Sequence, residues 1–364
     1  SMLAFGGYNM SNGGEEDLAN GASFDPSSGA WATLPKGPLP GIVGPVGAWS
    51  GTEFLIFGDP SSDGPEPATS PGAAYNPATQ SWRSLAPFPL GALADSASYA
   101  VWTGSRLLVW GFFGNDPANS ERGTTDTRAA MYDPTTNRWT ETSPAPVEAP
   151  IFGDAFWTGS ELLVWGQVGT SGSSTGRPQL VSYQPASDTW QVLGQPPASI
   201  SGDGAAAWTG SELVVGGGSA GSSAAAFTPS TGAWRSLPNA PEAFTGSNRY
   251  SDLWTGSDVL ILDDGDVQGR PLLFNPATNQ WRFGTASPVA GRTDGPAVWD
   301  GTQALVWGGG TPEELPVPSV GATVDLPPTP GASPVPTPLP ASLGGGTTCC
   351  TPAAAGYAYT PPSP

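Results

Sequence analysis

Short apolar runs alternate with glycine-, proline- and asparagine-rich turns along most of the chain. One stretch shows the pattern well: the run at 106–110 is followed by a second at 129–132, by alternating residues at 138–142 and by a fourth run at 152–157. Turn-forming residues separate these four runs. Runs of this length bounded by turn signals predict β-strands, so the stretch predicts four short strands.

The same pattern recurs every ~44 to 57 residues, and three signatures mark each copy. A Trp-x-Gly-Ser/Thr motif begins at Trp49, Trp102, Trp157, Trp208, Trp254 and Trp299. An aromatic-x-Pro motif begins at Phe24, Tyr75, Tyr132, Tyr183, Phe227, Phe274 and Tyr359. A second tryptophan follows the first six of these aromatics by seven residues, at Trp31, Trp82, Trp139, Trp190, Trp234 and Trp281. Four strands per repeat at this period are typical of propeller blades.

These motifs resemble kelch repeats, in the manner of the central propeller of galactose oxidase and its bacterial relatives. The diglycine that ends a strand of such repeats persists at Gly6–Gly7, Gly217–Gly218 and Gly308–Gly309. The resemblance covers nearly the whole chain and implies an all-β fold, a β-propeller with four-stranded antiparallel blades. Seven strand starts predict a seven-bladed plan whose seventh blade is incomplete in this chain. The run at 106–110 and its equivalents are expected to be the innermost strands.

The repeats predict three segments. Residues 1–310 form six blades and the first strand of the seventh, residues 311–352 form a Pro/Thr/Ser-rich insert, and residues 353–364 form a further strand of the seventh blade. Proline-rich composition of this kind does not build a core, although 321–326 has the pattern of an isolated strand. The insert carries adjacent Cys349 and Cys350, which are either two unlinked thiols, a strained vicinal disulfide or a link to another chain.

Charge and composition exclude several classes of function. The formal net charge of −19 repels phosphate backbones and anionic lipid surfaces, so nucleic-acid and membrane-surface partners are not expected. No apolar run is long enough for a membrane span, and no membrane insertion is expected in this segment. Histidine is absent and the cysteines lack metal-site spacing, which argues against zinc, copper or haem. We therefore expect no cofactor, and no copper-radical chemistry of the galactose-oxidase kind.

Candidate binding residues come from the longer connections. Antiparallel strands place the short turns at one end of each blade and the long, variable connections at the other, where binding residues are most often found. The charged candidates there are Asp116, Glu121, Arg122, Asp126, Arg128, Arg177, Arg249 and Arg270. Asp263, Asp264 and Asp266 form an oxygen-rich run, which is either a weak calcium site or a solvated turn. The loop 112–128 is likewise either a solvated loop or a ligand-contact loop.

These observations favour a non-catalytic, extracytoplasmic bacterial scaffold that binds a protein partner or assembles with itself. The acidic composition, the single lysine and the Pro/Thr/Ser-rich insert suit an exposed or secreted surface protein. One alternative is a structural subunit of a surface layer or filament. Another is a glycan-processing, sialidase-like enzyme, since several arginines from the variable loops could in principle converge, but the Asp-box motif of such enzymes is missing.

Overall fold

A computed structural model describes most of the repeat region of the chain. The described residues are 1–6, 8–9, 16–42, 45–58, 70–90, 99–113, 126–147, 151–168, 177–202, 204–218, 221–243, 251–262, 270–285, 297–306 and 322–324. In these ranges the regular structure is all β, as the sequence predicts. No helix suited to crossing a membrane occurs in the described part.

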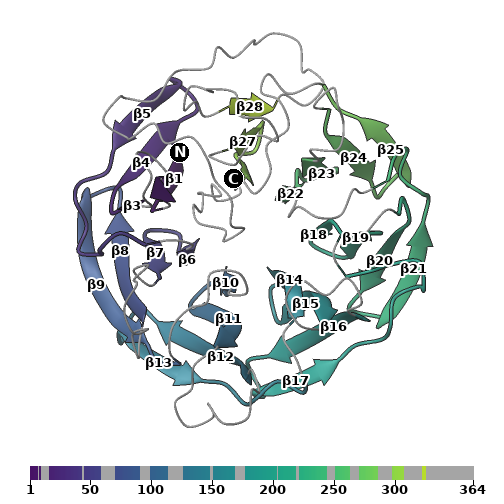
Figure 1. Cartoon of the computed structure of the whole chain (residues 1–364), viewed down its shortest axis with the longest axis horizontal. Coiled ribbons are helices and arrows are strands. Elements are labelled where there is room, and N and C mark those ends of the chain that lie inside the picture. Colours follow the sequence, from purple (N-terminus) through teal and green to yellow (C-terminus); the bar gives the residue numbers. More distant parts are fainter. Residues whose placement is uncertain are drawn as a thin grey trace. The chain divides into compact units, whose positions relative to one another are not determined.

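The strands form antiparallel sheets in which each strand pairs with the next along the chain (Figure 1). First strands are β6 (Val46–Trp49), β10 (Tyr99–Trp102), β14 (Ile151–Trp157), β18 (Ala206–Trp208), β22 (Ser251–Trp254) and β26 (Ala297–Trp299). Second strands are β1 (Met2–Phe5), β7 (Phe54–Phe57), β11 (Leu107–Phe113), β15 (Leu162–Val168), β19 (Leu213–Gly216), β23 (Val259–Leu262) and β27 (Ala304–Val306).

The third and fourth strands complete most of these sheets. Third strands are β4 (Gly21–Asp25), β8 (Ser70–Asn76), β12 (Asp126–Asp133), β16 (Arg177–Gln184), β20 (Ala224–Thr228), β24 (Leu272–Asn275) and β28 (Ala322–Val324). Fourth strands are β5 (Ala30–Thr33), β9 (Ser81–Phe88), β13 (Arg138–Glu141), β17 (Thr189–Val192), β21 (Ala233–Leu237) and β25 (Gln280–Phe283). Two residues each of β2 (Tyr8–Asn9) and β3 (Glu16–Asp17) form a separate small ladder.

Blade boundaries differ from the sequence prediction by one strand. The predicted innermost strand, at 106–110, is the second strand of its sheet, because β10 pairs with β11 through Trp102 and Leu107. The first strands of neighbouring sheets lie against each other instead: β10 against β14, and β14 against β18. A four-residue turn cannot carry the chain to another sheet, whereas the long connection after the fourth strand can. The prediction therefore divided the repeat at the wrong connection.

The predicted seven-bladed plan is not confirmed. In the described part, five sheets have four strands, and the sheets of β1, β4 and β5 and of β26, β27 and β28 have three strands each. Six of these sheets include an outer strand with the second tryptophan of the repeat, and these are the six recognisable blades. In the sheet of β26, β27 and β28 no outer strand lies within the described residues. Its third strand lies at Ala322–Val324, inside the segment predicted as an insert. Residues 353–364, predicted as a further strand, lie outside the described residues.

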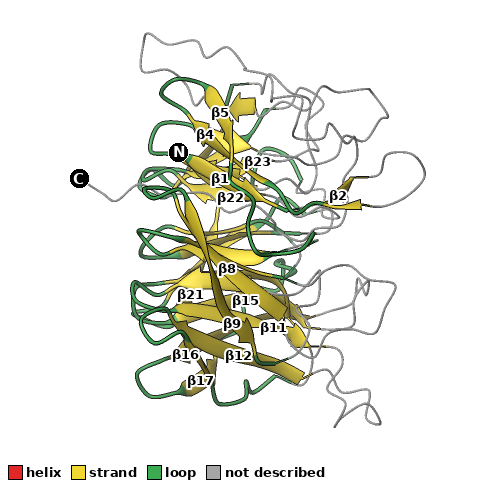
Figure 2. Cartoon of the chain, turned by 90° about the vertical axis from the view of Figure 1, so that its left-hand side faces the viewer, coloured by secondary structure: helices red, strands yellow, loops and turns green. Residues whose placement is uncertain are grey.

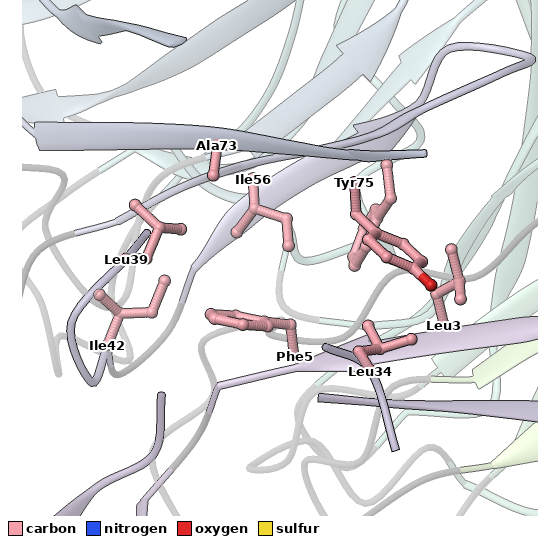
Figure 3. Close-up of a cluster of buried hydrophobic side chains, with 9 residues drawn as sticks. Leu3, Phe5, Leu34, Leu39, Ile42, Ile56, Ala73 and Tyr75 are labelled. Carbon is pink, nitrogen blue, oxygen red and sulfur yellow. The ribbon is translucent and has the colours of Figure 1, made fainter. Parts of the chain in front are cut away.

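The chain divides into two compact units. The first contains residues 1–56, 73–84 and 248–364, and the second contains 57–72 and 85–247. In the first, Leu3 and Phe5 of β1 pack with Ile42, Ile56 and neighbouring apolar side chains, as Figure 3 shows. The ring of Phe5 meets Trp82 edge to face at 5.2 Å between centroids, so β1 is fixed by side chains from the next sheet.

The second unit is built on the same principle. Trp110 in the middle of β11 is fully buried and stacks at a tilt on Trp190 of the following sheet, with 4.6 Å between ring centroids. Trp165, at the same position of β15, lies 5.5 Å from Trp234. Alternate residues of each second strand thus fill the space between successive sheets, which explains why both faces of these strands are apolar.

Candidate functional site

One end of every blade is formed by short turns of constant length, drawn as green loops in Figure 2. Four residues join each first strand to its second, and four join each third strand to its fourth. We call this the turn end. In the first type of turn, Thr103 Oγ1 accepts from the N–H of Arg106 and Gly104 has a φ of 93°. Only glycine adopts this conformation without strain, which explains the invariant Gly of the Trp-x-Gly signature.

The second type of turn links neighbouring sheets. Asn137 ends one of these turns with a φ of 54°, and its Oδ1 accepts from the hydroxyl of Tyr132 and from the N–H of Ala86 in the preceding sheet. Asp188 occupies the same position one sheet later, with a φ of 51°. Its Oδ1 accepts from the hydroxyl of Tyr183 and from the N–H of Ser143.

In four sheets the tryptophan of the fourth strand makes a second link to the preceding sheet. The Nε1 of Trp139 donates to the carbonyl of Ala86 at 2.9 Å, and that of Trp190 donates to Ser143 at 2.8 Å. Trp82 and Trp234 repeat the bond to Pro35 and Gly194. In all four cases the acceptor lies four residues after the tryptophan of the preceding sheet. These side chains therefore hold the scaffold together, as their recurrent positions suggested.

Ion pairs complete the turn end. In three blades the residue before the second strand is acidic and binds the arginine that follows the outer tryptophan. Glu212 binds Arg235 with both carboxylate oxygens, at 3.1 and 2.7 Å. The equivalent pairs are Glu53 with Arg83 and Asp258 with Arg282.

These contacts lower the pKa of two of the acidic partners, Glu212 and Asp258. Hydrogen bonding and charge from Arg235 hold the pKa of Glu212 below its ordinary value, although burial opposes them. Burial raises the pKa of Asp258, but hydrogen bonds from Arg282 and Ser257 outweigh it and the net shift is downward. The exposed carboxylate of Asp25 accepts hydrogen bonds from Ser27 and Ser28, which lower its pKa to about 2. The carboxylates of Glu212, Asp258 and Asp25 are thus occupied in structural contacts.

The opposite end, where the longer connections join the strands, we call the loop end. Most of the predicted binding residues belong to it. Asp116, Glu121, Arg122 and Arg249 lie outside the described residues, as do the possible calcium ligands Asp263, Asp264 and Asp266 and the cysteines Cys349 and Cys350. In the part that the structure describes, no group of three or more metal-ligating side chains occurs.

The remaining candidates mark the loop-end tips of two long hairpins. Asp126 begins β12 opposite Phe113, and Arg177 begins β16 opposite Val168. Both are two residues beyond the pair that contains a strand glycine, Gly111 or Gly166, so they occupy equivalent positions in neighbouring sheets. Arg128 follows Asp126 along β12. The side chain of Arg177 is exposed at this tip.

Arg270 is placed differently. Its guanidinium carbon lies 4.1 Å from the ring centroid of Phe283, the last residue of β25, in a cation–π contact. Arg270 therefore packs on its own sheet. The sequence analysis did not predict the ion pairs of the turn end. Two signals for them were visible in the sequence: an acidic residue four positions after the Trp of Trp-x-Gly-Ser/Thr, and an arginine directly after the second tryptophan.

Comparison with known proteins supports the repeat assignment. No protein-family model matches the chain. The chain is 26% identical over 174 residues to Kelch-like protein 35 of Mus musculus. The match covers 45% of this chain and 26% of that protein, so it spans about a quarter of the relative's length.

A solved structure, "Structure of YjhT", matches with a TM-score of 0.52 and 16% sequence identity, over 80% of this chain and 95% of that one. This likeness concerns the fold alone. Together with the four-stranded sheets, it identifies the fold as a β-propeller. The predicted resemblance to kelch-repeat propellers is confirmed.

Proposed function

We propose that this propeller is a non-catalytic scaffold that binds a protein partner through its loop end. The observation that carries the proposal is the difference between the two ends of each blade. At the turn end, constant four-residue turns, ion pairs within blades and tryptophan bonds between sheets engage many of the polar side chains in structural contacts. At the loop end, connections of unequal length meet the tips of two hairpins, one with the exposed Arg177 and the other with Asp126 at the equivalent position.

An extracytoplasmic location and a bacterial surface role belong to the same proposal. A chain with 31 acidic residues against 12 basic ones resists non-specific association with other acidic surfaces. A partner that neutralises part of this charge would associate faster than a neutral one, and the association rate would fall with salt. Self-assembly and glycan binding are the alternatives that the experiment must separate.

The test uses site-specific photo-crosslinking in cells that produce the protein. A photoreactive phenylalanine derivative replaces Arg177 at the loop end of β16. As a matched control it replaces Ser230, an exposed residue in the equivalent turn of the blade of β18 to β21. We expect a discrete adduct from position 177 and none from position 230, with the partner identified by mass spectrometry.

Other outcomes distinguish the alternatives. An adduct whose mass equals that of two copies of this chain would indicate self-assembly instead of binding to a different protein. Equal adducts from both positions, or none from position 177, would contradict the loop-end assignment. Turnover of a fluorogenic sialoside by the purified protein, lost on Arg177→Ala, would show the non-catalytic proposal to be wrong and favour a glycan-processing enzyme.

A further inference from the structure

The ion pairs at the turn end provide an internal comparison between blades. In three of them, a carboxylate before the second strand and an arginine from the outer strand meet in two parallel hydrogen bonds. Oxygen–nitrogen distances lie between 2.6 and 3.1 Å in the pairs of Glu53, Glu212 and Asp258. Each carboxylate sits in the same four-residue turn, so the fold itself builds a receptor for a guanidinium group. We call this receptor the arginine socket.

The blade of β14 to β17 has the socket without its arginine. Glu161 takes the place of Glu53 and Glu212, four residues after Trp157. Its backbone makes the standard turn bonds, with its N–H donating to Thr158 Oγ1 and its carbonyl accepting from the Thr158 N–H and hydroxyl. The arginine position, however, is held by Gln191, whose side chain is exposed. Within the described residues the carboxylate of Glu161 has neither a hydrogen bond nor an ion pair.

The neighbouring blade of β10 to β13 has the opposite charge at this position. Arg106 replaces the acidic residue, and its guanidinium reaches Asp133 only at 3.9 Å, with 48% of the arginine side chain exposed. Two successive sheets of the second unit thus carry unlike charges at equivalent positions, and neither charge is in a two-bond pair. The other three pairs are closed within their own blades.

We propose that the socket at Glu161 receives an arginine side chain from a partner protein. A guanidinium matches a carboxylate with two parallel bonds, which an ammonium group cannot do, so arginine is favoured over lysine. The half-buried carboxylate is held by the same turn geometry that positions its paired equivalents. This site lies at the turn end and is independent of the loop-end surface proposed above.

The first test is an NMR titration of the isotope-labelled full chain with N-acetyl-arginine amide and, separately, N-acetyl-lysine amide. We expect saturable shifts of the Ser160, Glu161 and Gln191 amides with the arginine probe, half-saturated on the order of 10 mM, and weaker shifts with lysine. Glu161→Gln removes the negative charge and replaces one of the two acceptor oxygens by a donor, so it should abolish them. Gln191→Arg fills the socket from within and should abolish them as well.

A matched control opens a second socket. In Arg235→Gln the carboxylate of Glu212 loses its arginine, so the probe should now also shift the Glu212 amide. Shifts of the Glu161 region that do not saturate, or that persist in Glu161→Gln, would overturn the proposal. Failure of Arg235→Gln to gain the second set of shifts would show that the turn is not a guanidinium receptor.

The second test addresses the protein partner. A photoreactive residue at Thr189, which is exposed beside Gln191, should give an adduct in producing cells. Glu161→Gln should reduce its yield about tenfold while adducts formed from position 177 stay unchanged. Saturable binding of the small probe without a Glu161-dependent adduct would overturn the assignment to a protein partner. Loss of the adduct from position 177 alone would instead contradict the loop-end proposal.

Discussion

The two ends of each blade are built from the same strands but obey different constraints. At the turn end, a change of one residue in length would displace the carboxylate, the left-handed residue and the tryptophan acceptor together. At the loop end, the connections between second and third strands range from the short link at 217–223 to longer ones such as 58–69. The comparison shows that the scaffold needs sequence identity at one end only. The connections at the other end vary in length without changing these contacts.

The largest loss of stability is expected when a tryptophan that links two sheets is removed. Trp139 stacks edge to face on Phe57 and Phe88 and donates to Ala86. Trp139→Ala should lower the free energy of unfolding by about 3 kcal/mol, measured by chemical denaturation. Trp139→Phe keeps the ring contacts and loses only the hydrogen bond, at a cost of about 1 kcal/mol. Equal losses in the two variants would mean that packing contributes little here.

A smaller effect is expected from the left-handed residue of the turn. Asn137→Ala loses the acceptor for Tyr132 and Ala86 and places at a φ of 54° a residue that tolerates the left-handed conformation less well than asparagine, so it should cost about 2 kcal/mol. Asn137→Gly loses the same acceptor but relieves the strain. If glycine and alanine destabilise to the same extent in thermal unfolding, strain has no part in the effect.

The sequence predictions agreed with the structure for features that nearby residues determine. They differed for features that depend on how distant parts of the chain pair. The strands and their turns could be predicted because proline, glycine and asparagine fix the backbone within a few residues. The blade boundary could not be predicted in the same way, because the cyclic order of the strands does not show which strand of the repeat is the first of a blade. The role of Glu212 escaped because its partner Arg235 is 23 residues away and only the paired strands bring them together.

Lowering the pH should distinguish the link made by Asp188 from the otherwise equivalent link made by Asn137. The N–H of Ser143 and the hydroxyl of Tyr183 hold the pKa of Asp188 below 3.8, whereas Asn137 does not titrate. Above about pH 5 Asp188 is ionised in both folded and unfolded chains and its contribution is complete. As the pH falls through the depressed folded pKa, that contribution is lost. Asp188→Asn should flatten this part of the acid unfolding curve, by about 0.5 kcal/mol after solvent screening. An unchanged acid slope would contradict the assignment.

The smallest effect on stability is expected at the loop end. Arg177→Ala should change the free energy of unfolding by less than about 0.5 kcal/mol, because the side chain is exposed and makes no ion pair within the described residues. The same variant should weaken the partner complex, measured by the adduct yield from a neighbouring crosslinker. A loss of stability comparable with that of Asn137→Ala would remove the distinction between the two ends.

The tryptophan bonds also have a direction in time. Each indole donor lies 40 to 53 residues later in the chain than the carbonyl that accepts its hydrogen bond. A ribosome therefore always completes the acceptor before it makes the donor, and every emerging sheet finds its docking point already synthesised. A nascent chain can add its sheets one by one onto a growing folded edge. If the sheets folded from the carboxyl end first, each indole N–H would lack its carbonyl acceptor until the preceding sheet had folded.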